Sequence, residues 1–270
     1  MPARRAITGK LASRFRRKAS RWVQAALLIA AGSAPAPVAT SPWRQVFSDD
    51  FTTDVPLGRF PAAVADHWWA YPDGWRDTSK RGVYSPSTVV SIAGGVMRLH
   101  LHAALGTARV AAPVPRIPGA AHSNSQRYGR YSVRFRADLL PGYKLAWLLW
   151  PDSETWPQDG EIDFPEGDAG GRICAAVHHR GATAGADQDQ FCTAATSNAW
   201  HVATTEWTPT AVTFILDGAT IGRSTARLPN TPMHWVFQTE TELGGLGPTP
   251  TTAGDVDIDR VTIDAYARHG

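Results

Sequence analysis

The segment Tyr-Ser-Val-Arg-Phe-Arg, residues 131–136, alternates apolar and polar side chains without a break. Because successive side chains of a β-strand point to opposite faces of a sheet, this pattern predicts a strand with one buried and one polar face. Residues 212–216 and 256–266 repeat the alternation, the second with a one-residue slip at Asp259-Arg260 that predicts a β-bulge. Residues 88–92 and 96–101 flank Ala93-Gly94-Gly95, which is typical of a hairpin turn.

The sequence between these strands lacks a convincing 3.6-residue period with helix caps. The 270 residues include 24 Gly, 20 Pro and 11 Trp, and 43% are hydrophobic, which excludes collagen, a disordered chain and a coiled coil. Short strands from residue 43 onward, with no linker to a second domain, predict an all-β, jelly-roll sandwich of two antiparallel sheets. We expect the Ala/Pro-rich residues 111–121 to form a surface loop.

The first 39 residues differ in charge from the rest of the chain. They contain eight Lys and Arg and no acid, whereas the remainder carries 19 basic and 24 acidic side chains, a net charge of −5. A basic segment, then apolar residues 23–31, then small residues and prolines is the usual layout of an export signal. The apolar run is shorter than the roughly 20 residues that span a bilayer, which disfavours the alternative of a retained membrane anchor.

We therefore expect residues 1–39 to be an export signal and residues 40–270 to be one folded domain, secreted as a monomer. A nucleic-acid-binding arm is the remaining alternative for the basic segment, and the acidic remainder argues against a nucleic-acid partner. The chain has two cysteines, and a disulfide persists outside the cell, so we expect a Cys174–Cys192 bridge. The motifs C-x-x-C, H-E-x-x-H and G-x-S-x-G do not occur.

Acidic residues are concentrated in Trp-Pro-Gln-Asp-Gly-Glu-Ile-Asp-Phe-Pro-Glu-Gly, residues 156–167. On a regular strand Glu161 and Asp163 share a face, and Glu166 points to the opposite one. Proline inside a sheet is confined largely to edges and bulges, so Pro165 predicts a bulge at Phe164-Pro165. One inserted residue returns Glu166 to the face of the other two acids.

With that bulge the outer acids are about four strand steps apart, roughly 13 Å between Cα atoms. Two glutamates that lean toward each other then leave about 5 to 6 Å between carboxyls, near the separation in retaining glycosidases. Crowded like charges should keep one carboxyl protonated near neutral pH, as an acid catalyst requires. The spacing therefore predicts cleavage of a glycosidic bond, and the alternatives are a calcium site or a solvated acidic strand.

These residues resemble glycoside hydrolase family 16, the laminarinase, lichenase and agarase group, in its bulged E-x-D-x-x-E form. The resemblance implies a concanavalin-like sandwich with a substrate groove on the concave face. It also implies that Glu161 is the nucleophile, Glu166 the acid/base and Asp163 the assisting acid. The resemblance covers roughly residues 43–267 and includes the segments 47–51, 128–136, 146–149, 177–178 and 258–263, with Trp207 and Asp217.

The resemblance further implies that Trp147, Trp156 and His178 line the groove. Gln238 and Glu240 are either sugar-hydroxyl binders or simple structural hydrogen bonders. For Trp150 a core position and a groove position are equally open, and Trp207 is expected in the core.

The resemblance implies that no cofactor is required. A structural calcium ion is an open alternative near Asp49, Asp50 and Asp259, which match positions close to a calcium site in some members. The sequence gives no other metal site.

The sequence therefore predicts a secreted retaining endo-glycosidase that hydrolyses internal β-glycosidic bonds of a polysaccharide, with a β-1,3-glucan-like substrate favoured. A transglycosylase on the same fold and a non-hydrolytic polysaccharide-binding sandwich are the alternatives, and binding alone does not need Glu161 and Glu166 together. Pro165 replaces the usual apolar residue of the bulge. Residues 238–241, Gln-Thr-Glu-Thr, replace a run that resembles Asn-Leu-Ala-Val in many members. These departures leave the sugar open.

Overall fold

Strand β9 (Gly129–Ala137) contains the alternating segment 131–136, and its side chains alternate between buried and half-buried as predicted. It lies inside a sheet between β14 (His201–Trp207) and β18 (Gly254–Tyr266). The pairing of β18 with β9 shifts between Ile258 and Arg260, which confirms the bulge predicted there. The computed structural model describes residues 41–119 and 124–267, so the predicted export signal lies outside the described residues.

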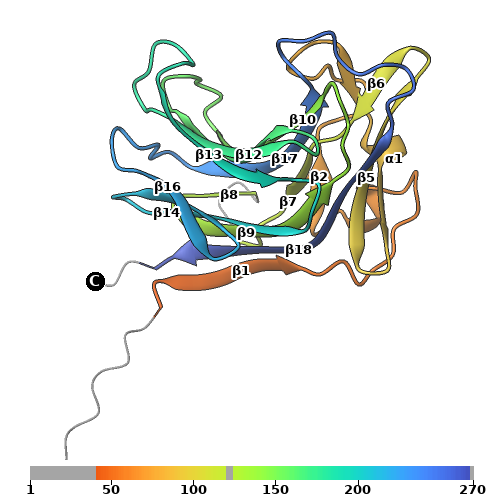
Figure 1. The fold of residues 1–270 in the computed structure, drawn as a ribbon. Coiled ribbons are helices and arrows are strands. Elements are labelled where there is room, and N and C mark those ends of the chain that lie inside the picture. The colour runs from red at the N-terminus through yellow and green to blue at the C-terminus, as the bar shows by residue number, and fades with distance from the viewer. Residues whose placement is uncertain (1–40, 120–123, 268–270) are drawn as a thin grey trace, which may run out of the picture. The chain divides into compact units, whose positions relative to one another are not determined.

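The larger sheet has ten strands in the order β16-β15-β14-β9-β18-β5-β6-β3, with β1 beside β18 and β4 beside β5 (Figure 1). Its other strands are β1 (Trp43–Asp49), β3 (Gly82–Tyr84), β4 (Val90–Ala93), β5 (Val96–Ala104), β6 (Thr107–Val110), β15 (Val212–Leu216) and β16 (Ala219–Ser224).

The second sheet has six strands in the order β13-β12-β11-β10-β17-β8. These are β8 (Ser125–Gln126), β10 (Tyr143–Pro151), β11 (Glu161–Asp168), β12 (Arg172–His178), β13 (Gln188–Thr196) and β17 (Met233–Thr241). A two-stranded sheet pairs β2 (Trp68–Ala70) with β7 (Pro113–Pro115). The described helices are a 3₁₀ turn at Ala62–Val64 and α1 (Pro86–Val89).

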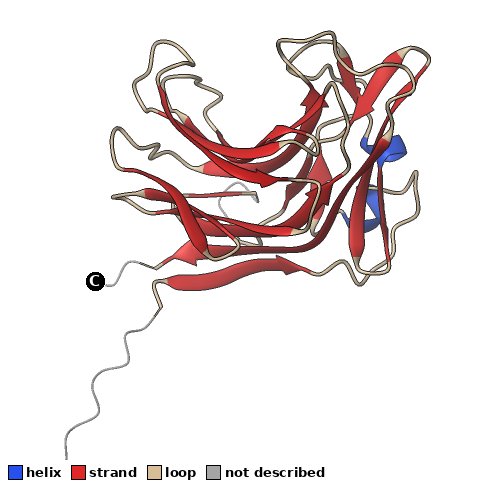
Figure 2. Ribbon diagram, in the orientation of Figure 1, coloured by secondary structure: helices blue, strands red, loops and turns tan. Residues whose placement is uncertain are grey.

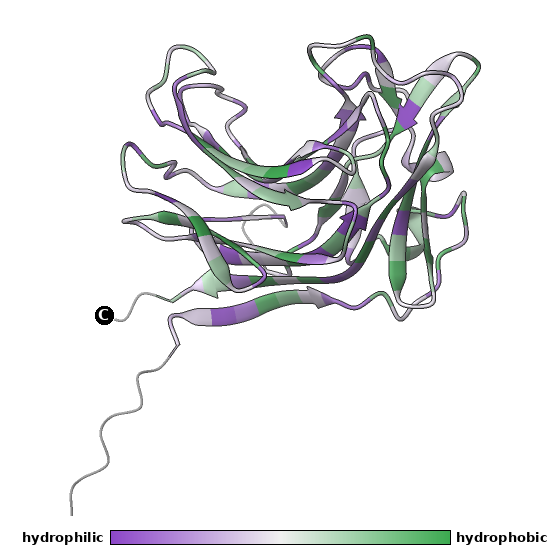
Figure 3. Ribbon diagram, viewed as in Figure 1, coloured by the Kyte–Doolittle hydropathy of each residue, from purple (hydrophilic) through white to green (hydrophobic). Residues whose placement is uncertain are grey.

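The core fills the space between the two large sheets, which lie one above the other as layers (Figure 2). Aromatic rings from both layers meet there: Tyr131 contacts Trp235 with ring centroids 5.4 Å apart, and Phe135 contacts Trp147 at 5.1 Å. Trp207 is fully buried, as predicted. Apolar and polar residues alternate along many of the strands (Figure 3), so each sheet can bury one face and leave the other polar. The predicted all-β sandwich is confirmed.

Three local features differ from the sequence prediction. Strands β3 and β6 pair in parallel, whereas the other pairs are antiparallel among the described strands. Residues 86–89 form one helical turn before β4, because Pro86 has the fixed φ that suits a first helical position. Residues 111–115 are buried rather than a surface loop, since β7 pairs with β2 and the Ala111 N–H donates to Thr239 Oγ1 (3.0 Å). None of the described helices is long and apolar enough to cross a membrane.

The predicted disulfide is present and joins two neighbouring strands of the six-stranded sheet. Cys174 on β12 lies directly opposite Cys192 on β13, with Cα atoms 4.1 Å apart. Cys174 also pairs with Glu166 of β11 on its other side. The bridge therefore ties the outermost strand of this sheet to the strand beside the acidic segment.

Replacing both cysteines by alanine should lower the free energy of unfolding by about 3 kcal/mol, because the bridge closes a loop of 18 residues in the unfolded chain. Urea unfolding of the oxidised protein and of the C174A/C192A variant measures the difference. Equal stabilities would show that the bridge contributes nothing to folding.

Candidate active site

The outer face of the six-stranded sheet forms the floor of a groove with a volume of about 1150 Å³. Side chains on β10 show how the strand alternation builds it: Lys144, Ala146, Leu148 and Trp150 line the groove. On the neighbouring β17, the residues opposite Trp150, Ala146 and Lys144 are His234, Gln238 and Glu240, and all three also line the groove.

Trp147 does not line the groove, so its predicted role in substrate binding is wrong. Its side chain is fully buried between the sheets. The centroid of its ring lies 4.9 Å from that of Phe237 and 5.1 Å from that of Phe135. The reason is parity, because Trp147 is an odd-numbered position on a strand whose even-numbered positions face the groove. Trp150, for which the sequence left core and groove open, lines the groove.

The bulge predicted in β11 is present and brings the three acids to one face. Asp163 pairs with Ala176 and Glu166 pairs with Cys174, so three steps on β11 match two steps on β12. The extra residue lies at Phe164-Pro165, where the Phe164 ring packs into the core 5.4 Å from Phe214. Glu161, Asp163 and Glu166 all line the groove as a result.

Glu161, Asp163 and His178 form a tight ionic group at one end of the acidic segment. His178 Nε2 lies 3.3 Å from Asp163 Oδ2 and 3.9 Å from Glu161 Oε2. His178 Nδ1 lies 2.7 Å from the Gly185 carbonyl oxygen, which can only accept a hydrogen bond, so Nδ1 carries a proton. The imidazole is thereby oriented with Nε2 toward the two carboxyls.

Burial dominates the electrostatics of these two acids. The pKa of Glu161 is raised well above its ordinary value by burial and by the charge of Asp163, while the charge of His178 opposes the rise. The pKa of Asp163 is raised by burial and then by the charge of Glu166. The sequence predicted one protonated carboxyl near neutral pH, and the structure gives raised pKa values to Glu161 and Asp163.

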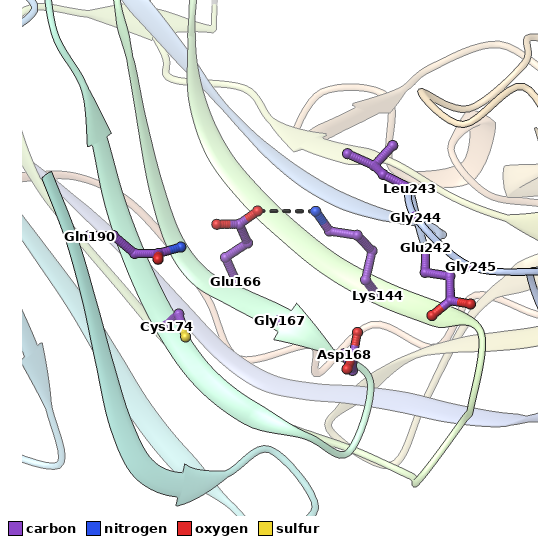
Figure 4. Close-up of a pocket in the computed structure, with 10 residues that line it drawn as sticks. All are labelled: Lys144, Glu166, Gly167, Asp168, Cys174, Gln190, Glu242, Leu243, Gly244 and Gly245. Atoms are coloured by element: carbon purple, nitrogen blue, oxygen red, sulfur yellow. Dashed lines mark hydrogen bonds and ion pairs between the residues drawn. The ribbon is translucent and has the colours of Figure 1, made fainter. Parts of the chain in front are cut away.

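Glu166 has a different partner, the ammonium group of Lys144, whose Nζ lies 3.0 Å from Glu166 Oε1 (Figure 4). The same Nζ lies 3.5 Å from Glu240 Oε1. Burial raises the pKa of Glu240, and the charge of Lys144 opposes that rise. Two ionic groups therefore surround these acids, Glu161 and Asp163 with His178, and Glu166 and Glu240 with Lys144.

Aromatic side chains stand along the groove on both sides of the acids. Trp150 and Trp156 stack with ring centroids 6.3 Å apart, and Trp156 is 39% exposed. Gly185 makes room for Trp156, since a Cβ there would lie 2.5 Å from its ring. Beyond β17, Tyr71, Trp75 and Tyr84 form a second aromatic group, with Tyr71 in contact with both other rings.

The structure places Trp156, His178, Gln238 and Glu240 in the lining of the groove, and their contact with sugar stays a prediction. Tyr84 Oη donates a hydrogen bond to Gln238 Oε1 (2.9 Å), so Gln238 also has the structural role that the sequence left open. Lys144 and the Tyr71, Trp75 and Tyr84 group were missed by sequence reasoning. For Lys144, the signal was available as a polar residue in an otherwise apolar strand.

A buried carboxyl that sequence reasoning also missed holds one wall of the groove. Asp77 is fully buried and accepts hydrogen bonds from Gly82 N (3.0 Å), Thr241 N (2.9 Å) and Thr241 Oγ1 (2.7 Å). It therefore fixes the loop that follows Trp75 against the end of β17, next to Glu240.

The acids predicted near a calcium ion do not form a donor set. Asp49 accepts hydrogen bonds from Phe51 N (2.8 Å) and Trp68 Nε1 (2.7 Å), and Asp259 forms an ion pair with Arg134. Within residues 41–119 and 124–267, side chains of Asp, Glu, His and Cys gather closely enough to hold an ion only at Glu161, Asp163 and His178, where the ionic contacts given above account for the closeness. Calcium binding stays a prediction.

Comparisons with known proteins agree with the fold. The family model described as glycosyl hydrolases family 16 matches residues 83–260, more than half of the chain. The laminarinase from Rhodothermus marinus is similar in structure, with a TM-score of 0.68 and 22% identity over 84% of this chain and 98% of that one. No curated protein matches the sequence.

Two further solved structures share the fold. The catalytic domain of an endo-1,3-beta-glucanase (laminarinase) from Thermotoga petrophila has a TM-score of 0.63 and 16% identity, covering 84% of this chain and 99% of that one. A Bacillus licheniformis beta-glucanase has a TM-score of 0.64 and 16% identity over the same shares.

Trp147→Ala should lower the free energy of unfolding by about 3 to 5 kcal/mol, because it leaves a large cavity in the core. Trp156→Ala removes a ring of the same size from the groove, and the loss should stay below about 1 kcal/mol. Denaturant unfolding of the two variants beside the parent protein measures both. The assignment of Trp147 to the core is wrong if the two losses are equal.

Proposed function

The chain belongs to glycosyl hydrolase family 16 and is a glycoside hydrolase, and on that premise we propose that it is a secreted, retaining endo-β-1,3-glucanase. The observation that carries the proposal is the position of Glu161, Asp163 and Glu166 on one face of an open groove. A retaining mechanism needs two carboxyls on one site, one to bond to the sugar and one to transfer protons. The bulge of β11 supplies them from a single strand.

In the first step we assign Glu161 as the nucleophile. Its carboxylate attacks the anomeric carbon while Glu166 donates a proton to the glycosidic oxygen, so the C–O bond breaks and the leaving sugar departs. The nucleophile has to be ionised, and burial opposes this by raising the pKa of Glu161. The charge of His178, oriented by the Gly185 carbonyl, favours the ionised form.

In the second step Glu166 acts as a base. It takes a proton from a water molecule, whose oxygen attacks the anomeric carbon and breaks the ester bond to Glu161. Two displacements at one carbon restore the original anomeric configuration. Asp163 lies between the two glutamates and acts on their charge without bonding to the sugar.

The substrate class is supported by the groove and by the similar structures. Aromatic rings on both sides of the acids, at Trp150 and Trp156 and at Tyr71 and Trp75, suit the apolar faces of consecutive sugar rings. Two of the similar structures described above are laminarinases. The groove has a volume of about 1150 Å³ and is lined by residues of β10, β11, β12, β13 and β17, and a site of this size suits binding and cleavage inside a chain.

The substrate is tested by following the release of reducing ends from laminarin, lichenan, agarose, carrageenan and chitin. We expect hydrolysis of laminarin, with oligosaccharides as early products, and NMR of the first product should show the β-anomer of the substrate. Hydrolysis of agarose or carrageenan alone would overturn the glucan assignment. Early appearance of the α-anomer would overturn retention.

The two glutamates are distinguished by replacing each in turn. Glu161→Gly should abolish hydrolysis and regain activity with azide, which occupies the vacated position and gives a product of opposite configuration. Glu166→Ala should still react quickly with substrates that carry good leaving groups, while turnover of polysaccharide falls by a factor of about 10² to 10⁴. Azide rescue of the Glu166 variant with retained configuration, and none at Glu161, would mean that the roles are exchanged.

Export is proposed from residues 1–39, whose basic, apolar and small-residue segments follow the order of an export signal. The mature protein recovered from the culture medium should therefore begin between about residues 33 and 41. N-terminal sequencing or intact mass decides this. A protein that stays in the cell and keeps residues 4 and 5 near its N-terminus has not been cleaved, and this result would contradict export.

A further inference from the structure

Among the described residues, Lys144 is the one lysine that contacts two acids of the groove. Its Nζ is 3.0 Å from Glu166 Oε1 (Figure 4). The same atom is 3.5 Å from Glu240 Oε1. The side chain of Lys144 is 14% exposed, that of Glu166 24% and that of Glu240 2%. The three groups are therefore largely shielded from solvent. An ion pair in such a position is screened much less than one at the surface.

The sheet register fixes this arrangement. Lys144 lies directly opposite Glu240 on β17, and Ala146, two residues further along β10, lies opposite Glu166 on β11. Lys144 thus reaches Glu166 on the diagonal, over a distance that a long side chain can span. The small side chain of Ala146 leaves the path open.

Lys144 is a cation in the folded protein. Burial alone would lower the pKa of Lys144, but the charges of Glu166 and Glu240 outweigh burial and raise it. A buried ammonium group without partners would be costly, so the two acids hold the side chain in place. Glu240 Oε2 is buried without a hydrogen-bond partner among the described residues, so the contact with Lys144 is a main source of compensation for this carboxyl.

We propose that Lys144 is a positioning residue that serves Glu166 in both of its protonation states, with Glu240 as the alternative partner. The proposal rests on the acid/base role assigned to Glu166 above. When Glu166 is ionised, the ammonium group pairs with Oε1 and leaves Oε2 for the water molecule or the glycosidic oxygen. When Glu166 is protonated, Glu240 keeps the ammonium group neutralised in the groove floor.

The two partners have opposite effects on proton transfer. The positive charge of Lys144 favours the carboxylate form of Glu166, which is the form needed in the second step. The negative charge of Glu240 offsets Lys144 and so favours the acid form, which is needed in the first step. Removing either partner should therefore move the protonation of Glu166, in opposite directions.

Other charged groups face Glu166, and none of them reproduces this arrangement. Asp163 and Glu161 lie on its own strand, and His178 on β12 contacts those two acids. Asp168 and Glu242 line the smaller pocket beside Lys144 and Glu166 (Figure 4). All the acids among them favour the protonated form of Glu166, so Lys144 is the cation in direct contact with it.

The test measures the titration of Glu166 with and without its partner. Carboxyl ¹³C NMR of protein labelled at glutamate, assigned with Glu166→Gln, gives the titration midpoint directly, and kcat/KM on laminarin against pH gives the basic limb. In Lys144→Met both should move to higher pH by about 1 unit, and in Glu240→Gln both should move to lower pH. Lys144→Arg keeps the charge and should stay near the parent values.

Lys80→Met is the matched control, because Lys80 lines the same groove without a contact to Glu166 among the ion pairs of the described residues. The titration midpoint of Glu166 in Lys80→Met should equal that of the parent protein, even if KM changes. Thermal melting confirms that each variant is folded, and the shift expected in Glu240→Gln tests the proposal if Lys144→Met does not fold. Equal midpoints in Lys144→Met and the parent would overturn the proposal.

The two readouts separate this proposal from the proposed function. If the NMR midpoint moves and the basic limb does not, the ion pair acts on Glu166 but Glu166 is not the acid/base. If laminarin is not hydrolysed at all, the glucanase assignment fails and the NMR midpoint still decides the role of Lys144. A loss of activity in Lys144→Met with both midpoints unchanged would mean that Lys144 is only structural.

Discussion

The one-residue bulge at Phe164-Pro165 is the constraint on which the site depends. A regular β11 would place Glu166 on the core face, where an uncompensated carboxyl costs several kcal/mol. Ordinary alternation already places Phe164 in the core against Phe214, and the bulge that follows it returns Glu166 to the groove beside Lys144. One inserted residue therefore lets the core packing of Phe164 coexist with the assembly of the three acids on one face.

The neighbours of β11 are adapted to the crowded acids. Ala146 and Ala176 lie opposite Glu166 and Asp163, and their small side chains leave space above the sheet. The basic side chains, Lys144 and His178, stand on opposite flanking strands and each contacts two acids. Because opposite charges within about 4 Å attract far more strongly away from water, this distribution keeps four acids within one fold.

Strand alternation and the proline in a strand were enough to predict the sandwich, the bulge and the face of Glu161, Asp163 and Glu166. The prediction failed at Trp147, because aromatic residues serve a core and a sugar-binding groove equally well. The alternation along β10 places Trp147 on the core face. That alternation can be assigned to a face only when one residue of the strand, such as Lys144, is known to face the groove. Asp77 and the aromatic group at Tyr71 could not be predicted, since their contacts join loops to β17 across more than 150 residues of sequence.

The buried acids Glu161 and Asp163 make the stability of the fold depend on pH. Burial raises the pKa values of Glu161 and Asp163, so the folded state binds protons more tightly there than the unfolded chain does. For such groups the stability is present below the unfolded pKa and is lost as pH rises toward the folded one. Ionising Glu161 and Asp163 at neutral pH therefore lowers the stability of the fold, and the ionised nucleophile that the reaction needs is formed at that cost. Glu166 on the same strand has a cationic partner instead, because Lys144 Nζ lies 3.0 Å from its Oε1, so acids a few residues apart lie in different electrostatic surroundings.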